Sequence, residues 1–233
     1  MTTTNIIGLI GAMEVEITSL RDAMTEKKSR VVSGVEFVEG KLDGQEVVTA
    51  VCGIGKVFAA VCAEAMILTY HPRLIINTGV GGTLSPELSI GDVAVADKVC
   101  QHDMDTTPLG DPPGLISGLG EVYFNASLGD AEHLIKCVKS VGGKAKLGTI
   151  ASGDQFIHSK EQKERIVKEF GAIACEMEGG SIGHVCRVND TPFCVVRAIS
   201  DGADDTSHMD YPTFVKMAAE QSVKVVRTFL SEQ

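Results

Sequence analysis

Short apolar runs alternate with helical patterns along most of the chain, and this alternation constrains the fold more than any other feature. The first run, 6–10, ends at a Gly-Ala pair, and Met13, Ile17 and Leu20 follow it at helical spacing. Further strand-like runs are 47–52, 74–78, 92–99, 147–152, 172–178 and 193–200, and further helical patterns are 56–70, 159–170, 181–187 and 211–230. This order predicts the α/β class, with a mixed, mostly parallel central sheet flanked by helices on both faces, formed by residues 1–233 as a single domain. The Gly-, Pro- and Asp-rich segment 101–125 is expected to be a long loop.

Composition excludes several classes of function. The 233 residues carry a net charge of -10, which argues against a surface for nucleic acid or for an anionic membrane. No uninterrupted apolar stretch is long enough to span a bilayer, and the first residues lack the basic region of a signal peptide. The seven cysteines are odd in number and include no C-x-x-C pair, so neither a disulfide framework nor a zinc site is indicated. A cytoplasmic location fits this pattern.

The common cofactor motifs are absent, so we expect neither a cofactor nor a metal. Segment 79–84 lacks the third small residue of the dinucleotide-binding fingerprint G-x-G-x-x-G. Lys56 follows Gly55, but no glycine stands five residues before Gly55 and no hydroxyl residue follows the lysine, which excludes a Walker A loop. No two of the six histidines stand four residues apart with a carboxylate at metal-binding spacing.

Polar residues that follow strands are the first candidates for a site, because ligands of open α/β sheets bind beyond the carboxyl ends of the strands. Glu16 shares the apolar stripe of Met13, Ile17 and Leu20, where an unpaired carboxylate is costly. A carboxylate in a first helical turn also complements the helix dipole, so a structural and a functional role remain equally open.

Two other strand ends carry acidic residues. In a regular strand Glu176 and Glu178 project to one side and Met177 to the other, and by themselves they are typical of a solvated strand end. Arg197 and Asp201 alternate onto one face of the run that ends at 200. An arginine in a buried strand needs a carboxylate partner, so Arg197 fits a structural ion pair, whereas Asp201 at the strand end is the better functional candidate. Phe156 follows another strand end, where packing or stacking on a base would each explain it.

Four segments together resemble one family. They are IGAMEVE (10–16), NTGVGG (77–82), CEME (175–178) and RAISD (197–201), and GIGKV (53–57) and SGDQFI (152–157) also match. Their order and spacing resemble the 5'-methylthioadenosine/S-adenosylhomocysteine nucleosidases of the nucleoside phosphorylase superfamily, from about residue 6 to residue 229. The resemblance implies hydrolysis of the N-glycosidic bond of a small nucleoside, without a cofactor, by a homodimer whose 101–125 loop closes the 5' side of the partner's site.

The resemblance also assigns roles to individual residues. Glu16 matches the carboxylate that activates water, and Asp201, placed by Ser200, matches the acid that protonates adenine at N7. Burial would raise the pKa of Asp201 so that it carries a proton at neutral pH. Arg197 is expected near the water and the ribose. The remaining substrate-binding positions are Glu178, Met177 and Glu176 at the ribose, Phe156 and Ile157 at adenine, Val80 and Gly81 in the glycine-rich loop, and Met13, Ile54 and Tyr211 at the 5' substituent.

The sequence departs from the family at two positions and leaves two other functions to weigh. Val80 stands where a Ser or Thr is usual, and Leu109 stands where an aromatic residue is common.

A phosphate-dependent nucleoside phosphorylase would share the fold, but Glu16 would repel its phosphate and no Arg and Ser flank the glycine-rich loop. A non-catalytic nucleoside-binding protein would not need Glu16 and Asp201 together. Preference among methylthioadenosine, S-adenosylhomocysteine, 5'-deoxyadenosine and aminofutalosine-type substrates stays open.

Overall fold

Strand β5 (Leu74–Thr83) organises the sheet, because three other strands pair with it. The computed structural model describes residues 4–201 and 211–233, without the side chains of 211 and 212. One edge of β5 runs parallel to β10 (Phe193–Asp201) along most of its length. The other edge pairs first with β1 (Ile7–Gly11) through residues 74–77, and then with β9 (Ala172–Glu176) through residues 82–83. Between these two pairings, 78–81 have no strand neighbour on that edge among the described residues.

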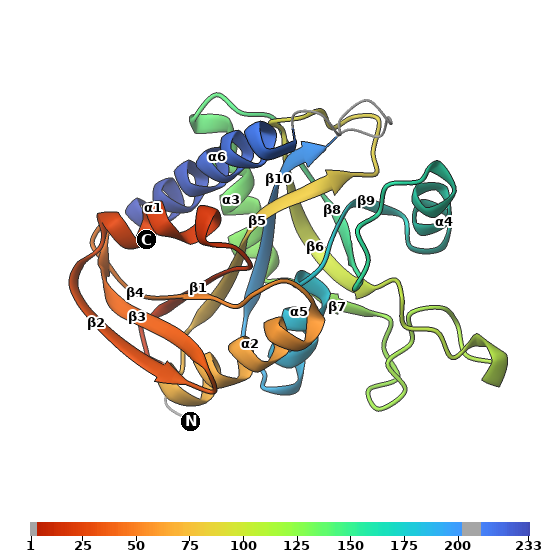
Figure 1. The fold of residues 1–233 in the computed structure, drawn as a ribbon, viewed down its shortest axis with the longest axis horizontal. Helices are drawn as coiled ribbons and strands as arrows, with labels where there is room; N and C mark the ends of the chain where they lie inside the picture. The colour runs from red at the N-terminus through yellow and green to blue at the C-terminus, as the bar shows by residue number, and fades with distance from the viewer. Residues whose placement is uncertain (1–3, 202–210) are drawn as a thin grey trace.

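The remaining strands extend this arrangement in two directions (Figure 1). Strands β4 (Gln45–Val51), β3 (Val35–Leu42) and β2 (Thr25–Val32) continue outward from β1. Strands β8 (Ala145–Ser152) and β6 (Val93–Gln101) connect β9 to β10, so that β5, β9, β8, β6 and β10 close a ring, and β7 (Tyr123–Asn125) pairs with β6. The expected mixed sheet is confirmed, but it is not mostly parallel, because the ten strand pairings of the described residues are five parallel and five antiparallel.

Helices cover both faces of the sheet, as the sequence predicts (Figure 1). On one face, α1 (Glu14–Ala23), α3 (Leu128–Ser140) and α6 (Tyr211–Ser231) enclose an apolar cluster that includes Leu20, Leu134 and Phe229. On the other face, α2 (Lys56–Tyr70) and α5 (Gly179–Val188) pack against residues such as Ile10 and Ile75. Helix α4 (Lys160–Phe170) covers a smaller cluster beside β8 and β9. No helix in the described part of the chain combines the length and the apolar character that crossing a bilayer requires.

Several local expectations are confirmed and others are wrong. The capping box of α4 is present, since the Ser159 hydroxyl accepts from Gln162 N and the Gln162 side chain accepts from Ser159 N. The strand expected at 172–178 ends instead at Glu176, because Glu178 turns to become the N-cap of α5. The strand expected to stop at 78 continues through the glycines to Thr83. The long loop is confirmed except that it contains a 3-10 turn, η1 (Thr107–Leu109), and the short β7.

The β2–β3 hairpin and α3 are missing from the sequence-based prediction. Strand β2 is exposed along almost its whole length, so it lacks the apolar alternation that would reveal it. Strand β3 contributes Phe37, which is fully buried and lies 5.6 Å from the Tyr70 ring, measured between ring centroids. The hairpin therefore joins the main core mainly through β3, while Val32 at the end of β2 packs against the edge of that core.

We expect Phe37→Ala to lower the free energy of unfolding by about 3–5 kcal/mol, because it removes a buried ring and leaves a cavity. Val31→Ala on the neighbouring β2 is the control, since Val31 is exposed and should change stability by less than about 0.5 kcal/mol. Urea unfolding monitored by circular dichroism measures both. Equal losses in the two variants would contradict this description of the hairpin.

Candidate active site

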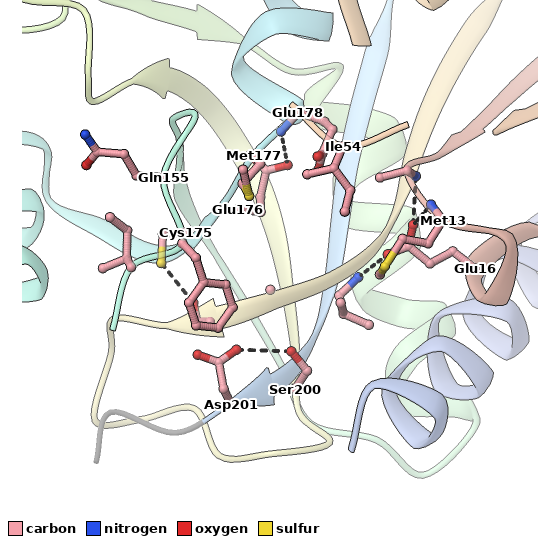
Figure 2. Close-up of a pocket in the computed structure, with 16 residues that line it drawn as sticks. Met13, Glu16, Ile54, Gln155, Cys175, Glu176, Met177, Glu178, Ser200 and Asp201 are labelled. Atoms are coloured by element: carbon pink, nitrogen blue, oxygen red, sulfur yellow. Dashed lines mark hydrogen bonds between the residues drawn. The ribbon is translucent and has the colours of Figure 1, made fainter. Parts of the chain in front are cut away.

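A cleft opens beside β5, between its pairings with β1 and β9, at the carboxyl ends of the neighbouring strands (Figure 2). The cleft contains about 650 Å³ of empty space when its open mouth is counted. Twelve of the positions expected from the sequence line it: Met13, Glu16, Ile54, Val80, Gly81, Phe156, Ile157, Glu176, Met177, Glu178, Ser200 and Asp201. Ala12, Gly82, Gln155 and Cys175 complete the lining.

Glu16 is held by backbone donors from two elements. Its Oε2 accepts from Ala12 N at 2.7 Å and from Met13 N at 2.9 Å, at the turn between β1 and α1. Its Oε1 accepts from Val80 N at 3.0 Å, on the part of β5 that has no strand neighbour. The side chain is only 4% exposed, so these three bonds fix the carboxylate at the cleft. The glutamate therefore does more than complement the dipole of α1.

The glycines of β5 let the site residues approach the backbone closely. A Cβ at Gly79 would lie 2.4 Å from Glu16 Oε1, and a Cβ at Gly82 would lie 2.7 Å from Asp201 Oδ2. At Gly81 the nearest atoms would be the carbonyl oxygen of Cys175 at 3.0 Å and the Arg197 side chain at 3.4 Å. Any side chain at 79 or 82 would displace a carboxylate, so these glycines allow the two carboxylates to approach the strand closely.

Arg197 lies behind the cleft wall and is absent from its lining. The guanidinium is 1% exposed, and its Nη2 donates to Asn77 Oδ1 and to Glu176 Oε2. Glu178 Oε2 is a second carboxylate partner at 3.7 Å. These contacts match the structural ion pair that the strand pattern allowed. Arg197 is thus a buried counter-charge that offsets part of the cost of placing carboxylates here.

Glu176 and Glu178 are neighbours in sequence but differ in their surroundings. Glu176 Oε2 also accepts from the backbone N–H groups of Glu178 and Gly179, and its Oε1 accepts from the Ser152 hydroxyl. Glu178 Oε1 accepts from Gly55 N at 3.0 Å. Burial, followed by the charge of Glu176, raises the pKa of Glu178 to about 7. Glu176 thus anchors the network, and Glu178 presents a carboxyl group with a raised pKa to the cleft.

The opposite end of the cleft carries Asp201 and the aromatic candidate. Ser200 Oγ donates to Asp201 Oδ1 at 3.1 Å, as the sequence-based role of Ser200 requires. Burial, with the charge of Asp201 among the further causes, raises the pKa of the neighbouring Cys175 thiol to about 12. Phe156 is 50% exposed at the mouth, whereas Ile157 is buried. The ring of Phe156 is therefore accessible to a flat ligand, and Tyr211 lies outside the described side chains.

Sequence reasoning missed three supporting residues. Asn77 links Arg197 to β1, because its Nδ2 donates to the Ile10 carbonyl at 3.0 Å. Ser152 accepts from Gly180 N at 2.5 Å while it donates to Glu176. Gly55 supplies the N–H for Glu178 with a backbone φ of 101°, a region that glycine occupies readily. Asn77, Ser152 and Gly55 all fall within the segments that carry the resemblance. The signal that could have revealed Asn77 and Ser152 is that each is a polar residue near the end of a buried strand.

Comparison with known proteins agrees with this geometry. The family model of the phosphorylase superfamily matches residues 6–231, so the fold and site belong to a member of that superfamily. A 5'-methylthioadenosine/S-adenosylhomocysteine nucleosidase of Staphylococcus aureus is 40% identical over 228 residues, which are 97% of this chain and 100% of that protein. Within the superfamily, the chain belongs to the 5'-methylthioadenosine/S-adenosylhomocysteine nucleosidase family.

Solved structures extend the comparison to bound ligands. The Neisseria meningitidis nucleosidase in complex with methylthio-immucillin-A has a TM-score of 0.93 and 34% identity, covering 99% of this chain and 100% of that one. A futalosine hydrolase of Helicobacter pylori has a TM-score of 0.92 and 34% identity, covering 98% of each chain. The expected nucleoside phosphorylase-like fold class is confirmed.

The raised pKa of Glu178 makes stability depend on pH. Because the folded-state pKa of about 7 lies above the ordinary 4.5, this group's stabilising contribution is complete below pH 4.5 and is lost as pH rises through 7. We expect the free energy of unfolding to fall between pH 5 and pH 8 by about 1–3 kcal/mol more in the parent protein than in Glu178→Gln. Urea titrations at both pH values measure the difference, and an equal fall in both proteins would contradict the assignment.

Proposed function

We propose that this chain hydrolyses the N-glycosidic bond of 5'-methylthioadenosine and S-adenosylhomocysteine, releasing adenine and the 5-thioribose product. The observation that carries the proposal is the placement of two buried carboxyl groups, Glu16 and Asp201, against Gly79 and Gly82 of one strand. Three residues of extended chain span about 10 Å, which leaves room for a sugar ring and a water molecule. Inverting glycosidases separate their acid and base by about 6.5–9.5 Å for the same reason.

The chemistry assigns each carboxyl group a task. Cleavage of the C1'–N9 bond leaves cationic character on the sugar and negative charge on adenine. Protonated Asp201 donates to adenine N7, so that the base leaves as a neutral molecule, and Glu16 accepts a proton from the water that attacks C1'. Glu178 receives the ribose hydroxyls above Met177, and Phe156 stacks on adenine while the backbone of Ile157 binds the edge of the base. The nearby carboxylates also stabilise the oxocarbenium-like transition state.

Three features support water over phosphate as the nucleophile. Glu16 places a carboxylate where phosphate would bind, and like charges repel strongly in a poorly solvated cleft. Val80 offers an apolar side chain in the glycine-rich segment, packed beside Val215 and Ala218. Arg197 is already engaged by Asn77 and Glu176, so it is not free to hold an anion. These features favour the hydrolase over a phosphorylase.

The nucleophile can be tested directly. We expect adenine release from 5'-methylthioadenosine in phosphate-free buffer at a rate that added phosphate does not raise, with 5-methylthioribose as the sugar product. Chromatography coupled to mass spectrometry identifies the product in each buffer. A strict need for phosphate, or a sugar 1-phosphate product, would show a phosphorylase, and no cleavage at all would favour a nucleoside-binding protein.

The two carboxyl groups can be tested separately. We expect Glu16→Gln and Asp201→Asn each to lower kcat by about 10²–10⁴, because each removes one of the two proton transfers of the proposed cleavage. Both changes keep the side-chain size, so the circular dichroism spectrum should stay that of the parent. The exposed Glu14→Gln on the same helix is the matched control and should keep near-normal kcat. Near-normal kcat in either variant would remove its residue from the mechanism.

We also propose that the chain acts as a cytoplasmic homodimer. Ile54 in the cleft lining and Val57 and Phe58 at the start of α2 leave apolar side chains exposed, and Leu109 in the long loop is 83% exposed. A second copy covering these residues would close the 5' side of the site. All seven cysteines are free and buried, which suits a reducing compartment.

The dimer has a simple solution test. Light scattering at assay concentration should give twice the chain mass of 24.7 kDa. Phe58→Asp should lower this mass toward that of one chain, because a charge would be buried in the interface, while Val188→Asp, at an exposed position on α5, should not. A fully active monomer of the parent protein would contradict the proposal.

A further inference from the structure

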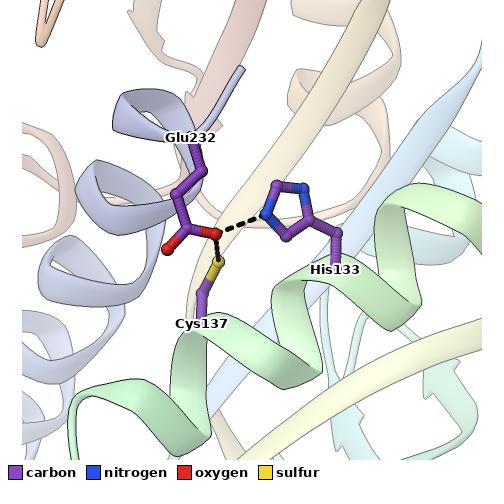
Figure 3. A group of neighbouring side chains, drawn as sticks. All are labelled: His133, Cys137 and Glu232. Carbon is purple, nitrogen blue, oxygen red and sulfur yellow. Dashed lines mark hydrogen bonds and ion pairs between the residues drawn. The ribbon is translucent and has the colours of Figure 1, made fainter.

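A second group of reactive side chains lies outside the cleft, between α3 and the end of the chain (Figure 3). His133 and Cys137 are four residues apart on α3 and therefore project from the same face of the helix. Glu232, just beyond α6, reaches both of them, with Oε2 at 2.7 Å from His133 Nε2 and at 3.8 Å from Cys137 Sγ. The three residues share no member with the cleft lining.

The atoms of this group are spaced like the ligands of a zinc ion. All three lie within 4.8 Å of one another. In a tetrahedral site with ordinary bond lengths, neighbouring ligand atoms are about 3.4–3.6 Å apart. The sulfur–oxygen distance of 3.8 Å is already close to this value, and the nitrogen–oxygen distance of 2.7 Å needs to open by less than 1 Å. Imidazole and thiolate are also the ligand types that zinc prefers.

The surroundings hold the group in place while leaving it open to solvent. The ring of His133 packs against Phe229, with centroids 4.9 Å apart, and this contact restricts its orientation. Cys137 is buried at the base, whereas the side chains of His133 and Glu232 are 26% and 47% exposed. An ion can therefore reach the thiol from one side, past the two exposed ligands.

We propose that His133 Nε2, Cys137 Sγ and a carboxylate oxygen of Glu232 bind a zinc ion, with water at the fourth position. Three protein ligands and one water make an open tetrahedral site. Because the ion would join α3 to the end of α6, its effect is to fasten two helices that cover the same face of the sheet. The site is independent of the proposed hydrolysis.

Proton balance follows from the hydrogen bonds in the metal-free protein. The thiol donates to Glu232, and because a zinc-bound cysteine is a thiolate, zinc binding releases this proton to solvent. His133 Nδ1 lies 3.3 Å from the Gln233 side-chain amide nitrogen. When Nε2 binds the ion, the ring proton moves to Nδ1, the Gln233 amide nitrogen moves away from that atom, and the imidazole stays neutral. One proton is thus released for each ion bound.

Cobalt(II) gives a direct test, because its bond to a thiolate produces a charge-transfer band in the near ultraviolet. Tag-free protein titrated with cobalt chloride should develop this band up to one equivalent, and zinc chloride should then remove it. Cys137→Ser should abolish the band, and Glu232→Gln should weaken cobalt binding by at least about tenfold, since it replaces a charged ligand with a neutral amide. Cys186→Ala is the matched control, because Cys186 is an equally buried thiol without these neighbours.

A second readout separates metal binding from a purely structural contact. Zinc should raise the thermal midpoint of the parent and of Cys186→Ala, and should leave the midpoint of Cys137→Ser unchanged. If Cys137→Ser does not fold, Glu232→Gln, at an exposed position, carries the same comparison. A parent protein without the charge-transfer band, or a band that survives in Cys137→Ser, would overturn the proposal and leave the group as a hydrogen-bonded contact between two helices.

Discussion

The close approach of side chains to the backbone of β5 is the constraint on which the rest of the site depends. Where β5 leaves β1 and has not yet met β9, its edge is free, and Glu16 accepts the Val80 N–H that a neighbouring strand would otherwise bind. Only glycine at 79 and 82 leaves space for Glu16 and Asp201 beside the strand. One stretch of backbone therefore places both carboxyl groups and opens the cleft between them.

The second requirement is a balance of charge in a buried place. Glu16, Glu176, Glu178 and Asp201 are each less than 9% exposed, and Arg197 is the cation buried among them in the described part of the chain. Asn77 accepts a hydrogen bond from Arg197 and Ser152 donates one to Glu176, while burial and the charge of Glu176 raise the pKa of Glu178. The same network that neutralises the wall of the cleft also removes the arginine from any role in binding phosphate.

The sequence predicted most of the site because each segment that resembles the family is short and continuous and lies at the end of a strand. Twelve of the fourteen expected positions line one cleft, while Arg197 lies behind it and the side chain of Tyr211 is not described. The sequence did not predict the ring of strands around β5, because a closing pair such as β5 with β10 joins residues more than a hundred positions apart. Glu178 was placed on a strand because the pattern does not reveal that the chain turns after Glu176. The group around Cys137 was missed because Glu232 is 95 residues away.

Glycine substitution tests the central claim most directly, since it adds a methyl group beside each carboxyl group and leaves Glu16 and Asp201 themselves unchanged. The measurement is kcat for hydrolysis of 5'-methylthioadenosine by Gly79→Ala, Gly82→Ala and the control Gly129→Ala, where an added Cβ meets no atom within 4 Å. The account predicts that kcat falls by about 10² or more in each of the first two variants, because a displacement of about 1 Å in a reacting group costs that much, and that the control stays near normal. Near-normal kcat in folded Gly79→Ala and Gly82→Ala would contradict it.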